Sequence, residues 1–306
     1  MSKVLRIGTR DSELALWQAN QVKNGIEKQG FSAELVPVKS IGDRNQEQPL
    51  YEMGITGIFT KALDVALINN EIDIAVHSMK DVPTNLPKGV VQAAVLPRAN
   101  TEDILLHHGT NFLKSEEPST IATGSLRRKA QWLHKFPNDK VVNLRGNVNT
   151  RMRKLDENPW QGAIFAAAGL ERINLKPEKH LSLDWMIPAP AQGAMVVLVK
   201  ENDELSQQAL QKLNDRESEI TTHIERQFLN ILEGGCTAPI GANAKIDGNN
   251  IHFEGAIFSL DGKKHLHAEE DFSVKDFENK GKDLAKKLLS SGGDELMKQI
   301  KANLPG

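Results

Sequence analysis

The chain alternates short apolar runs with segments in which apolar residues recur every three or four positions. After the run "VLRIGTR", Ala15, Ala19, Val22 and Ile26 are spaced by four, three and four, which predicts a helix that begins near Ser12. The segments "AELVPVK", "DIAVHS" and "VQAAVLP" predict further strands, and "IFTKALDVALINN" predicts a second helix. This alternation predicts a mostly parallel α/β sheet.

A second alternation begins near Thr101. "STIATGS" predicts a strand before the helix "LRRKAQWLHKF", and "KVVNLRG" predicts a strand before the helix "VNTRMRKLDEN". "GAIFAAAGL" is typical of a buried strand that runs into a turn. "MIPAPAQGAM" predicts a connector because proline and glycine interrupt it, and "MVVLVK" predicts one more strand.

The C-terminal part has a different pattern. A helix is predicted from about Glu217 to Glu233, and three strands follow, joined by the hairpin sequences "DGNN" and "LDGK". Two helical stretches, broken at "SSGG", end the chain. This pattern predicts a small α+β domain.

Composition is that of an ordinary soluble protein of two or three domains, with 39% hydrophobic and 25% charged residues in 306. A single cysteine excludes an internal disulfide framework and favours a reducing compartment. The start, "MSKVLRIGTR", has no apolar run of signal-peptide length, and no stretch is long enough to span a membrane. These features predict a cytoplasmic protein.

Positive charge is concentrated between Thr120 and Lys154, a segment that contains nine Lys and Arg residues and a single acidic residue, Asp139. The net charge of the chain is −2, so the remainder is acidic. A basic block in an acidic protein favours an anionic ligand over nucleic acid. The alternative is a solvated helix face, which is the commoner meaning of a charge run.

Three predicted strand-to-helix junctions carry arginine together with serine or threonine. Ligands gather at such junctions because helix N-termini present free N–H groups there, and the planar fork of arginine binds carboxylates and phosphates. The residues are Arg10 and Ser12 in "GTRDS", Thr123, Ser125, Arg127 and Arg128 in "TGSLRRK", and Arg145 and Arg151 in "LRGNVNTR".

The segment "AVHSMKDVP" places Ser78, Lys80 and Asp81 just after a buried strand. Asp81 either forms the turn before Val-Pro or stabilises positive charge that develops in a reaction. His77 is expected to be structural, because no second ligand lies at metal-binding spacing, and we expect no metal site. The lone Cys236, in "LEGGCTAPIG", is either a small buried apolar residue or a nucleophile or attachment point.

These motifs together resemble the hydroxymethylbilane synthase, or porphobilinogen deaminase, family. The resemblance rests on "RIGTRDSELALWQ", "FTKALDVAL", "DIAVHSMKDVPT", "TGSLRRKAQ", "LRGNVNTR", "AAAGLERI", "PAPAQGAM" and "LEGGCTAPIGANA". The matches occur in the family's order and extend from Arg6 to the end of the hairpin domain. "HSMKDVP" and "LEGGC" are the most specific.

The resemblance implies a dipyrromethane cofactor, built from two porphobilinogen units and attached to Cys236 through a thioether. Porphobilinogen carries an acetate and a propionate, so two cofactor rings and four substrate rings bring twelve carboxylates. The implied cofactor-binding residues are Cys236, Ser78, Lys80, Thr123, Ser125, Arg127, Arg128 and Arg145. The implied substrate-binding residues are Arg10, Ser12, Arg151, Arg172 and Gln192.

The implied activity is that of a transferase in heme biosynthesis. Porphobilinogen loses ammonia to give a cationic azafulvene, which the free α-carbon of the growing chain attacks, and Asp81 is the implied catalytic residue. After four additions, hydrolysis releases linear hydroxymethylbilane, which is passed to or released for uroporphyrinogen-III synthase. The resemblance also implies a monomer with no nucleic-acid or membrane partner.

The implied fold has two α/β domains resembling periplasmic binding proteins and a third, small α+β domain. We expect domain 1 over 1–98 and 192–214, domain 2 over 99–191 and domain 3 over 215–306, with chain crossings near Leu96–Asp103 and Pro188–Gln192. Four positions depart from the family: Glu52 and Thr56 stand where many relatives have lysine, Gly124 replaces a common serine, and Ala191 replaces a common glycine.

Two other functions compete with this one. A non-catalytic binding module of similar fold, closing on a small anion, explains the arginines but gives no reason for "LEGGC". A thiol hydrolase needs a histidine paired with Cys236. His223 is the nearest in sequence, and nothing marks it as a base.

Overall fold

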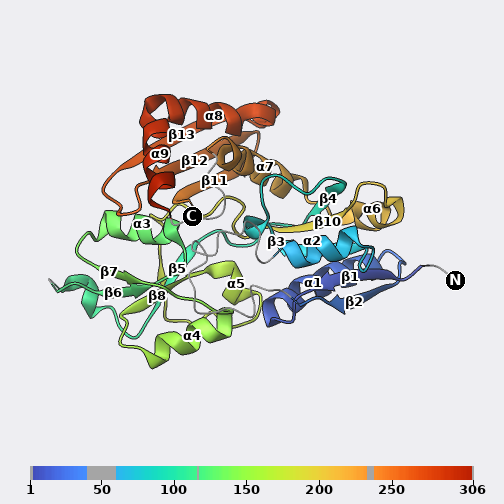
Figure 1. Cartoon of the computed structure of the whole chain (residues 1–306), viewed down its shortest axis with the longest axis horizontal. Coiled ribbons are helices and arrows are strands. Elements are labelled where there is room, and N and C mark those ends of the chain that lie inside the picture. Colours follow the sequence, from blue (N-terminus) through green and yellow to red (C-terminus); the bar gives the residue numbers. More distant parts are fainter. Residues whose placement is uncertain (1–2, 40–59, 116, 233–237, 305–306) are drawn as a thin grey trace. The chain divides into compact units, whose positions relative to one another are not determined.

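The computed structural model describes residues 3–39, 60–115, 117–232 and 238–304 of the chain (Figure 1). These residues form two compact units. The first unit holds the described residues of Met1–Asn45 and Ile55–Ala99 together with Gly193–Ile220, and the second holds those of Asn100–Gln192 and Thr221–Gly306. The chain therefore leaves the first unit after Ala99 and returns to it at Gly193.

The first unit is built on a five-stranded sheet with the order β2-β1-β3-β10-β4. Its strands are β1 (Leu5–Thr9), β2 (Ala33–Pro37), β3 (Ile74–Ser78), β4 (Val90–Val95) and β10 (Met195–Lys200), and its helices include α1 (Glu13–Glu27), α2 (Lys61–Ile68) and α6 (Glu204–Leu210). The pairs β1/β2 and β1/β3 are parallel, whereas β10 is antiparallel to both β3 and β4. The sheet is therefore mixed.

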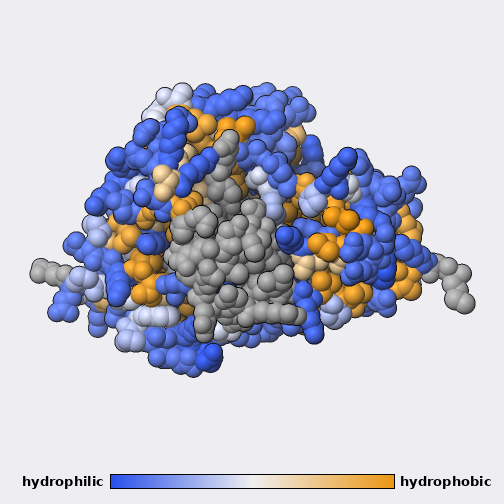
Figure 2. All heavy atoms as spheres, viewed as in Figure 1, coloured by the Kyte–Doolittle hydropathy of each residue, from blue (hydrophilic) through white to orange (hydrophobic). Residues whose placement is uncertain are grey.

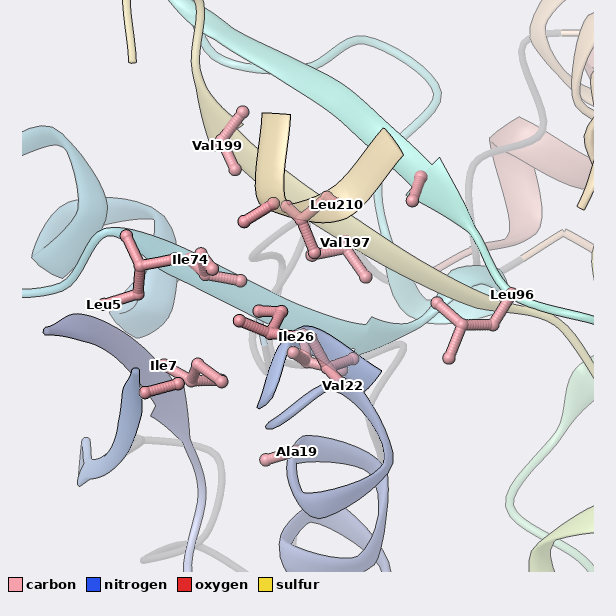
Figure 3. Close-up of a cluster of buried hydrophobic side chains, with 14 of the residues drawn as sticks. Leu5, Ile7, Ala19, Val22, Ile26, Ile74, Leu96, Val197, Val199 and Leu210 are labelled. Atoms are coloured by element: carbon pink, nitrogen blue, oxygen red, sulfur yellow. The ribbon is translucent and has the colours of Figure 1, made fainter. Parts of the chain in front are cut away.

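Two helices cover opposite faces of this sheet because side chains alternate along each strand. Leu5 and Ile7 of β1 join a buried cluster with Ala19, Val22 and Ile26 of α1 (Figure 3). Strand β10 and helix α6 complete that cluster with Val197, Val199 and Leu210. On the other face, Gly8 lies against Leu63 of α2 and Ile72, and a side chain at Gly8 would clash with both.

The second unit contains a five-stranded sheet with the order β7-β6-β8-β5-β9, in which β5 is antiparallel to β8. The strands are β5 (Asp103–His107), β6 (Thr120–Ala122), β7 (Lys140–Val142), β8 (Gly162–Ala166) and β9 (Leu181–Ser182), and the helices are α3 (Leu126–Lys135), α4 (Val148–Glu157) and α5 (Ala167–Glu171). Trp132 of α3 packs on Leu105 and Ile164, on one face. Leu155 of α4 and Leu170 of α5 pack on the other face.

The second unit also contains the three-stranded antiparallel sheet β11-β12-β13. Its strands are β11 (Ile240–Asp247), β12 (Asn250–Phe258) and β13 (His265–Ser273), and the helices around it are α7 (Arg216–Ile231), α8 (Lys280–Leu288) and α9 (Asp294–Asn303). Phe253 of β12 packs edge-to-face on Phe228 of α7, with ring centroids 5.2 Å apart. The opposite face of β12 presents Ala256 and Phe258 to Ala130 of α3, so α3 packs between the two sheets of this unit.

The structure confirms the predicted fold class of two α/β sheets followed by a small α+β part. Both hairpins of the C-terminal sheet form as predicted, and Ser291 and Gly292 leave helical geometry within "SSGG". The three-domain division stays a prediction. Polar residues cover most of the described surface on the face drawn in Figure 2, and in the described residues no helix is long and apolar enough to cross a membrane.

Two expectations are corrected. The first sheet is mixed rather than mostly parallel, because β10 returns from the second unit and pairs antiparallel with both β3 and β4. An antiparallel strand needs no crossover helix, so the alternation of strands and helices does not determine its direction. "GAIFAAAGL" runs from β8 directly into the short helix α5, not into a turn, because alanine and leucine favour helix. Strand β5 and helix α6 were not predicted at all.

Candidate functional site

Strand β3 ends in a tight turn that holds Lys80 and Asp81. The turn is a 3-10 helix over Met79–Asp81, closed by the Val82 N–H donating to the Met79 carbonyl at 3.1 Å. Met79 and Val82 are buried and anchor the turn on both sides, whereas Lys80 and Asp81 are partly exposed. The turn can therefore present a carboxylate without burying it.

Ser78 and Ser12 are each held by α1. The Gln18 side-chain amide of α1 donates to Ser78 Oγ at 2.8 Å, and Ser12 caps the same helix by accepting from the Ala15 N–H at 3.4 Å. Arg10 lies between β1 and this cap and is partly buried. The first unit thus brings the ends of β1 and β3 to the N-terminal half of α1.

Behind the β3 turn lies a buried pair that the sequence did not identify as a pair, Asp64 of α2 and His77 of β3. Their Oδ1 and Nε2 atoms are 3.8 Å apart. Burial raises the pKa of Asp64 to about 6, against a smaller opposing effect of Thr60. Burial, together with the charge of Arg10, lowers the pKa of His77 to about 4, so His77 is neutral at pH 7, as expected of a structural histidine.

In the second unit, Arg127 and Arg128 converge on Asp103, a fully buried residue that the sequence analysis did not single out. Arg128 donates through Nε at 2.9 Å and Nη2 at 2.7 Å to Asp103 Oδ1, and Arg127 Nη2 lies 2.7 Å from Asp103 Oδ2. Gln192 also donates to Asp103 Oδ1, at 2.9 Å. One carboxylate therefore gathers three predicted ligand-binding residues.

Thr123 and Ser125 build the turn before α3. Thr123 Oγ1 accepts from the Ser125 N–H at 3.2 Å, and Ser125 Oγ caps the helix by accepting from the Arg128 N–H at 3.4 Å. Gly124 between them lies so close to the Leu144 carbonyl that a Cβ would be 2.6 Å from its oxygen. A serine at position 124 would therefore force the turn to shift.

Three other predicted ligand-binding arginines of the second unit lie after β7, within α4 and after α5. Arg145 follows β7 and is buried, and burial lowers its pKa. Arg172 follows α5, and burial lowers its pKa to about 10 despite the opposing effect of Glu171. Arg151 of α4 donates through Nε to the Gly146 carbonyl at 2.8 Å. Arg145 and Arg172 thus carry charge at sites where an anion would stabilise it.

The connector before β10 is held by a second buried carboxylate, Glu225 of α7. Its two oxygens accept from the Ala191 N–H and the Ala244 N–H, each at 2.6 Å. Ala191 has a φ of 62°, in the left-handed region that favours glycine. The next residue, Gln192, also donates to the Thr101 carbonyl at 2.8 Å.

The structure thus brings together the predicted residues of each unit separately. Ser12, Ser78, Lys80 and Asp81 belong to the first unit, and Arg127, Arg128 and Gln192 meet in the second. Cys236, Glu52 and Thr56 lie outside the described residues. His223 Nε2, the one histidine near Cys236 in sequence, lies 3.1 Å from the Glu278 carbonyl.

The donor set of the second unit fits a ligand with several carboxylates. Burial lowers the pKa of Arg127, Arg145 and Arg172, so each guanidinium is a cation held partly away from water. A carboxylate is the natural partner of such a fork. Within the part of the chain that the structure describes, no cluster of three or more metal-ligating side chains forms.

Comparison with known proteins gives consistent matches along nearly the whole chain. Residues 5–208 match the family described as porphobilinogen deaminase, dipyromethane cofactor binding domain, and residues 220–290 match the porphobilinogen deaminase C-terminal domain. A porphobilinogen deaminase of Geobacter sulfurreducens is 39% identical over 97% of this chain and 94% of its own length. One of Campylobacter hominis is 40% identical over 96% and 97%.

Among solved structures, similarity extends to a periplasmic substrate-binding protein of an ABC transporter from Coxiella burnetii. It is 13% identical, with a TM-score of 0.44, over 71% of this chain and 94% of its own. The extent and identity of the sequence matches decide the family. The chain belongs to the porphobilinogen deaminase family, the transferases that join porphobilinogen into hydroxymethylbilane with a dipyrromethane cofactor.

Proposed function

We propose that this chain polymerises four porphobilinogen molecules with Asp81 as its catalytic residue and Cys236 as the attachment point of dipyrromethane. The observation that carries the proposal is that the chain holds both a partly exposed carboxylate, Asp81, in the first unit and a set of buried arginines in the second. An acidic side chain suits a cation, and arginines suit the acetate and propionate groups of the rings. The attached cofactor would supply the free α-carbon to which each new ring is joined.

Asp81 would stabilise the cation that forms when porphobilinogen loses ammonia. Its turn is anchored by two buried apolar residues, so the carboxylate is held in place before the charge develops, and little reorganisation is needed. Lys80 and Ser78, at the same strand end, would hold the acidic side chains of the rings. Ser78 is already oriented by Gln18.

The arginines of the second unit would hold the ring carboxylates. Arg145, with Arg127, Arg128, Thr123 and Ser125, would serve the cofactor rings, while Arg151, Arg172 and Gln192, with Arg10 and Ser12 of the first unit, would serve the incoming substrate. Each unmatched carboxylate removed from water would cost several kcal/mol, so this many cations would be needed. We further propose a cytoplasmic monomer whose product passes to uroporphyrinogen-III synthase.

Intact mass spectrometry of the purified protein tests the attachment. Protein from a heme-making host should exceed its sequence mass by one dipyrromethane. Cys236→Ser should lose both the added mass and the activity, whereas Asp81→Asn should keep the added mass. A fully active protein of unmodified mass would refute the attachment, and an unmodified protein that binds small anions without turnover would favour a non-catalytic binding module.

A further inference from the structure

Asp103 is the centre of a buried charge cluster in the second unit. It is the first residue of β5, it is fully buried, and its carboxylate contacts Arg127, Arg128 and Gln192 at 2.7–2.9 Å. These contacts join α3, β5 and the connector that leads to β10. A single side chain therefore contacts three proposed ligand-binding residues.

The two arginines of the cluster are bound in different ways. Arg128 places both Nε and Nη2 on Asp103 and donates Nη1 to the Ile164 carbonyl at 3.0 Å. Arg127 places Nη2 on Asp103 and donates Nη1 to the Ile187 carbonyl at 2.6 Å, while its buried Nε has no hydrogen-bond acceptor among the residues that the structure describes. All three nitrogens of the Arg128 guanidinium are thus engaged within the cluster, whereas the Nε donor of Arg127 remains for a ligand.

The cluster also has an excess of positive charge. Two guanidinium groups face one carboxylate, and among the described residues the charges that act on the pKa of Arg127 are those of Asp103 and Arg128, with opposite signs. Burial has the largest effect and lowers that pKa. An excess cation away from water is unfavourable until an anion joins it.

We propose that Asp103 is a positioning residue for the cofactor site, which rests on the function proposed above. Its carboxylate neutralises Arg128 and orients Arg127, so that the excess charge and the Nε donor of Arg127 serve one carboxylate of the ligand. The neighbouring arginines therefore have different roles. Within the cofactor-binding set proposed above, Arg128 serves indirectly, as the internal counter-ion, and Arg127 is the arginine of this pair that contacts the ligand.

The first test is cofactor loading of Asp103→Asn, measured as the fraction of protein that carries the added mass. The substitution keeps the shape of the side chain and removes its charge. We expect the loaded fraction to fall by roughly tenfold or more, the loss typical when the group that orients a ligating side chain is removed. The matched control is Asp139→Asn. Asp139 also contacts α3, because its Oδ2 accepts from Trp132 Nε1 at 2.9 Å, and we expect the variant to load cofactor normally.

A second variant separates positioning from folding, because Asp103→Asn leaves two buried cations with no carboxylate. Asp103→Asn/Arg128→Gln removes one charge of each sign, so we expect folding to recover in thermal unfolding. Loading should stay low, since Arg127 has lost its anchor. Recovery of loading together with folding would overturn the proposal and leave Asp103 as a neutralising residue only.

A double-mutant cycle with Arg127→Gln provides the last test. If Asp103 acts through Arg127, adding Asp103→Asn to Arg127→Gln should cause no further loss of loading. Losses that multiply independently would overturn the proposal. The unsubstituted protein separates failure of the proposed function from failure of the role of Asp103. If the unsubstituted protein carries no added mass, the proposed function is refuted. If it is loaded and the Asp103 variants are equally loaded, only the role of Asp103 is refuted.

Discussion

The two five-stranded sheets have corresponding strand orders, yet they bury charge in opposite ways. In the first, β3 and α2 bury Asp64 and His77, and burial moves both pKa values toward the neutral forms. In the second, β5 and α3 bury Asp103 in ion pairs with two arginines, each at 2.7 Å. The same scaffold therefore supports a buried pair with little charge in one unit and an excess of positive charge in the other.

This difference agrees with the roles proposed for the two units. A unit that presents one carboxylate, Asp81, to a developing cation would be hindered by fixed positive charge beneath it, and the neutral His77 avoids that. A unit that binds several carboxylates needs cations that remain charged. A counter-ion such as Asp103 stabilises the charge of a buried guanidinium, but it occupies donors of that guanidinium that could otherwise bind a carboxylate of the ligand.

Among the substitutions that test this difference in buried charge between the two sheets, we expect the largest effect at Arg128. Arg128→Leu removes two hydrogen bonds to Asp103 and one to the Ile164 carbonyl from a buried site. Each buried acceptor left unsatisfied costs about 1–3 kcal/mol, so we expect a loss of about 3–5 kcal/mol in unfolding free energy, accompanied by poor cofactor loading. Arg127→Leu should also impair loading. Arg153→Leu is the control, because Arg153 is exposed and its ion pair is with its helix neighbour Glu157. Urea unfolding and intact mass provide the two measurements.

Arg172→Leu should have the opposite profile. Burial lowers the pKa of Arg172 to about 10, which means that its charge is disfavoured in the folded chain, and leucine removes that cost. We expect stability equal to or above that of the parent, normal loading, and stalled elongation with discrete added pyrroles in mass spectra. Normal turnover of the Arg127, Arg128 and Arg172 variants would show that these arginines do not bind the rings.

In the first unit, Asp81→Asn tests whether the partly exposed carboxylate acts by charge or by shape. Asn favours the same turn, so we expect a melting temperature near that of the parent. Turnover per loaded molecule should fall by roughly a hundredfold to a thousandfold, the usual loss when one preorganised electrostatic contact is removed. Asp81→Glu should retain part of the activity. Equal rates for Asn and parent would make Asp81 a turn residue.

Local pattern predicted most of the fold. The spacing of Ala15, Ala19, Val22 and Ile26 gave helix α1 with its Ser12 cap, and the turn sequences placed both C-terminal hairpins. The antiparallel positions of β10 and β5 could not be predicted in this way, because they depend on which strand of a distant segment pairs with them. Strand direction in a sheet is a long-range property with no local signature.

The candidate site was predicted through its cations, and its internal partners were missed. The arginines stand in dense motifs, whereas Asp103 is one acid at the start of the apolar run "DILLH", and Glu225 is one acid of an amphipathic helix. Nothing local distinguishes either from an exposed acid. Only the fold shows that both are fully buried acceptors.

The smallest expected effect concerns the buried pair of the first unit and its dependence on pH. The folded pKa of His77, about 4, lies below its ordinary value of 6.5, so the unfolded chain binds the proton more tightly and stability falls as pH falls from 6.5 towards 4. The folded pKa of Asp64, about 6, lies above its ordinary 3.8, so the stability that it contributes is lost as pH rises from 3.8 to 6. In the parent, the two dependences largely cancel between pH 4 and 6.

Single substitutions should separate these dependences. Asp64→Asn leaves only the His77 titration, so its stability relative to the parent should decrease as pH is lowered through this window, by on the order of 2–3 kcal/mol. His77→Gln leaves only Asp64, so its relative stability should decrease as pH is raised. Urea unfolding at several pH values from 4 to 6.5 measures both, and comparison with the parent cancels other groups such as Asp73, whose pKa of about 2 places its own titration at lower pH. Slopes of the same sign in the two variants would show that Asp64 and His77 do not bury their neutral forms independently, and the contrast between the two sheets would then not hold for the first.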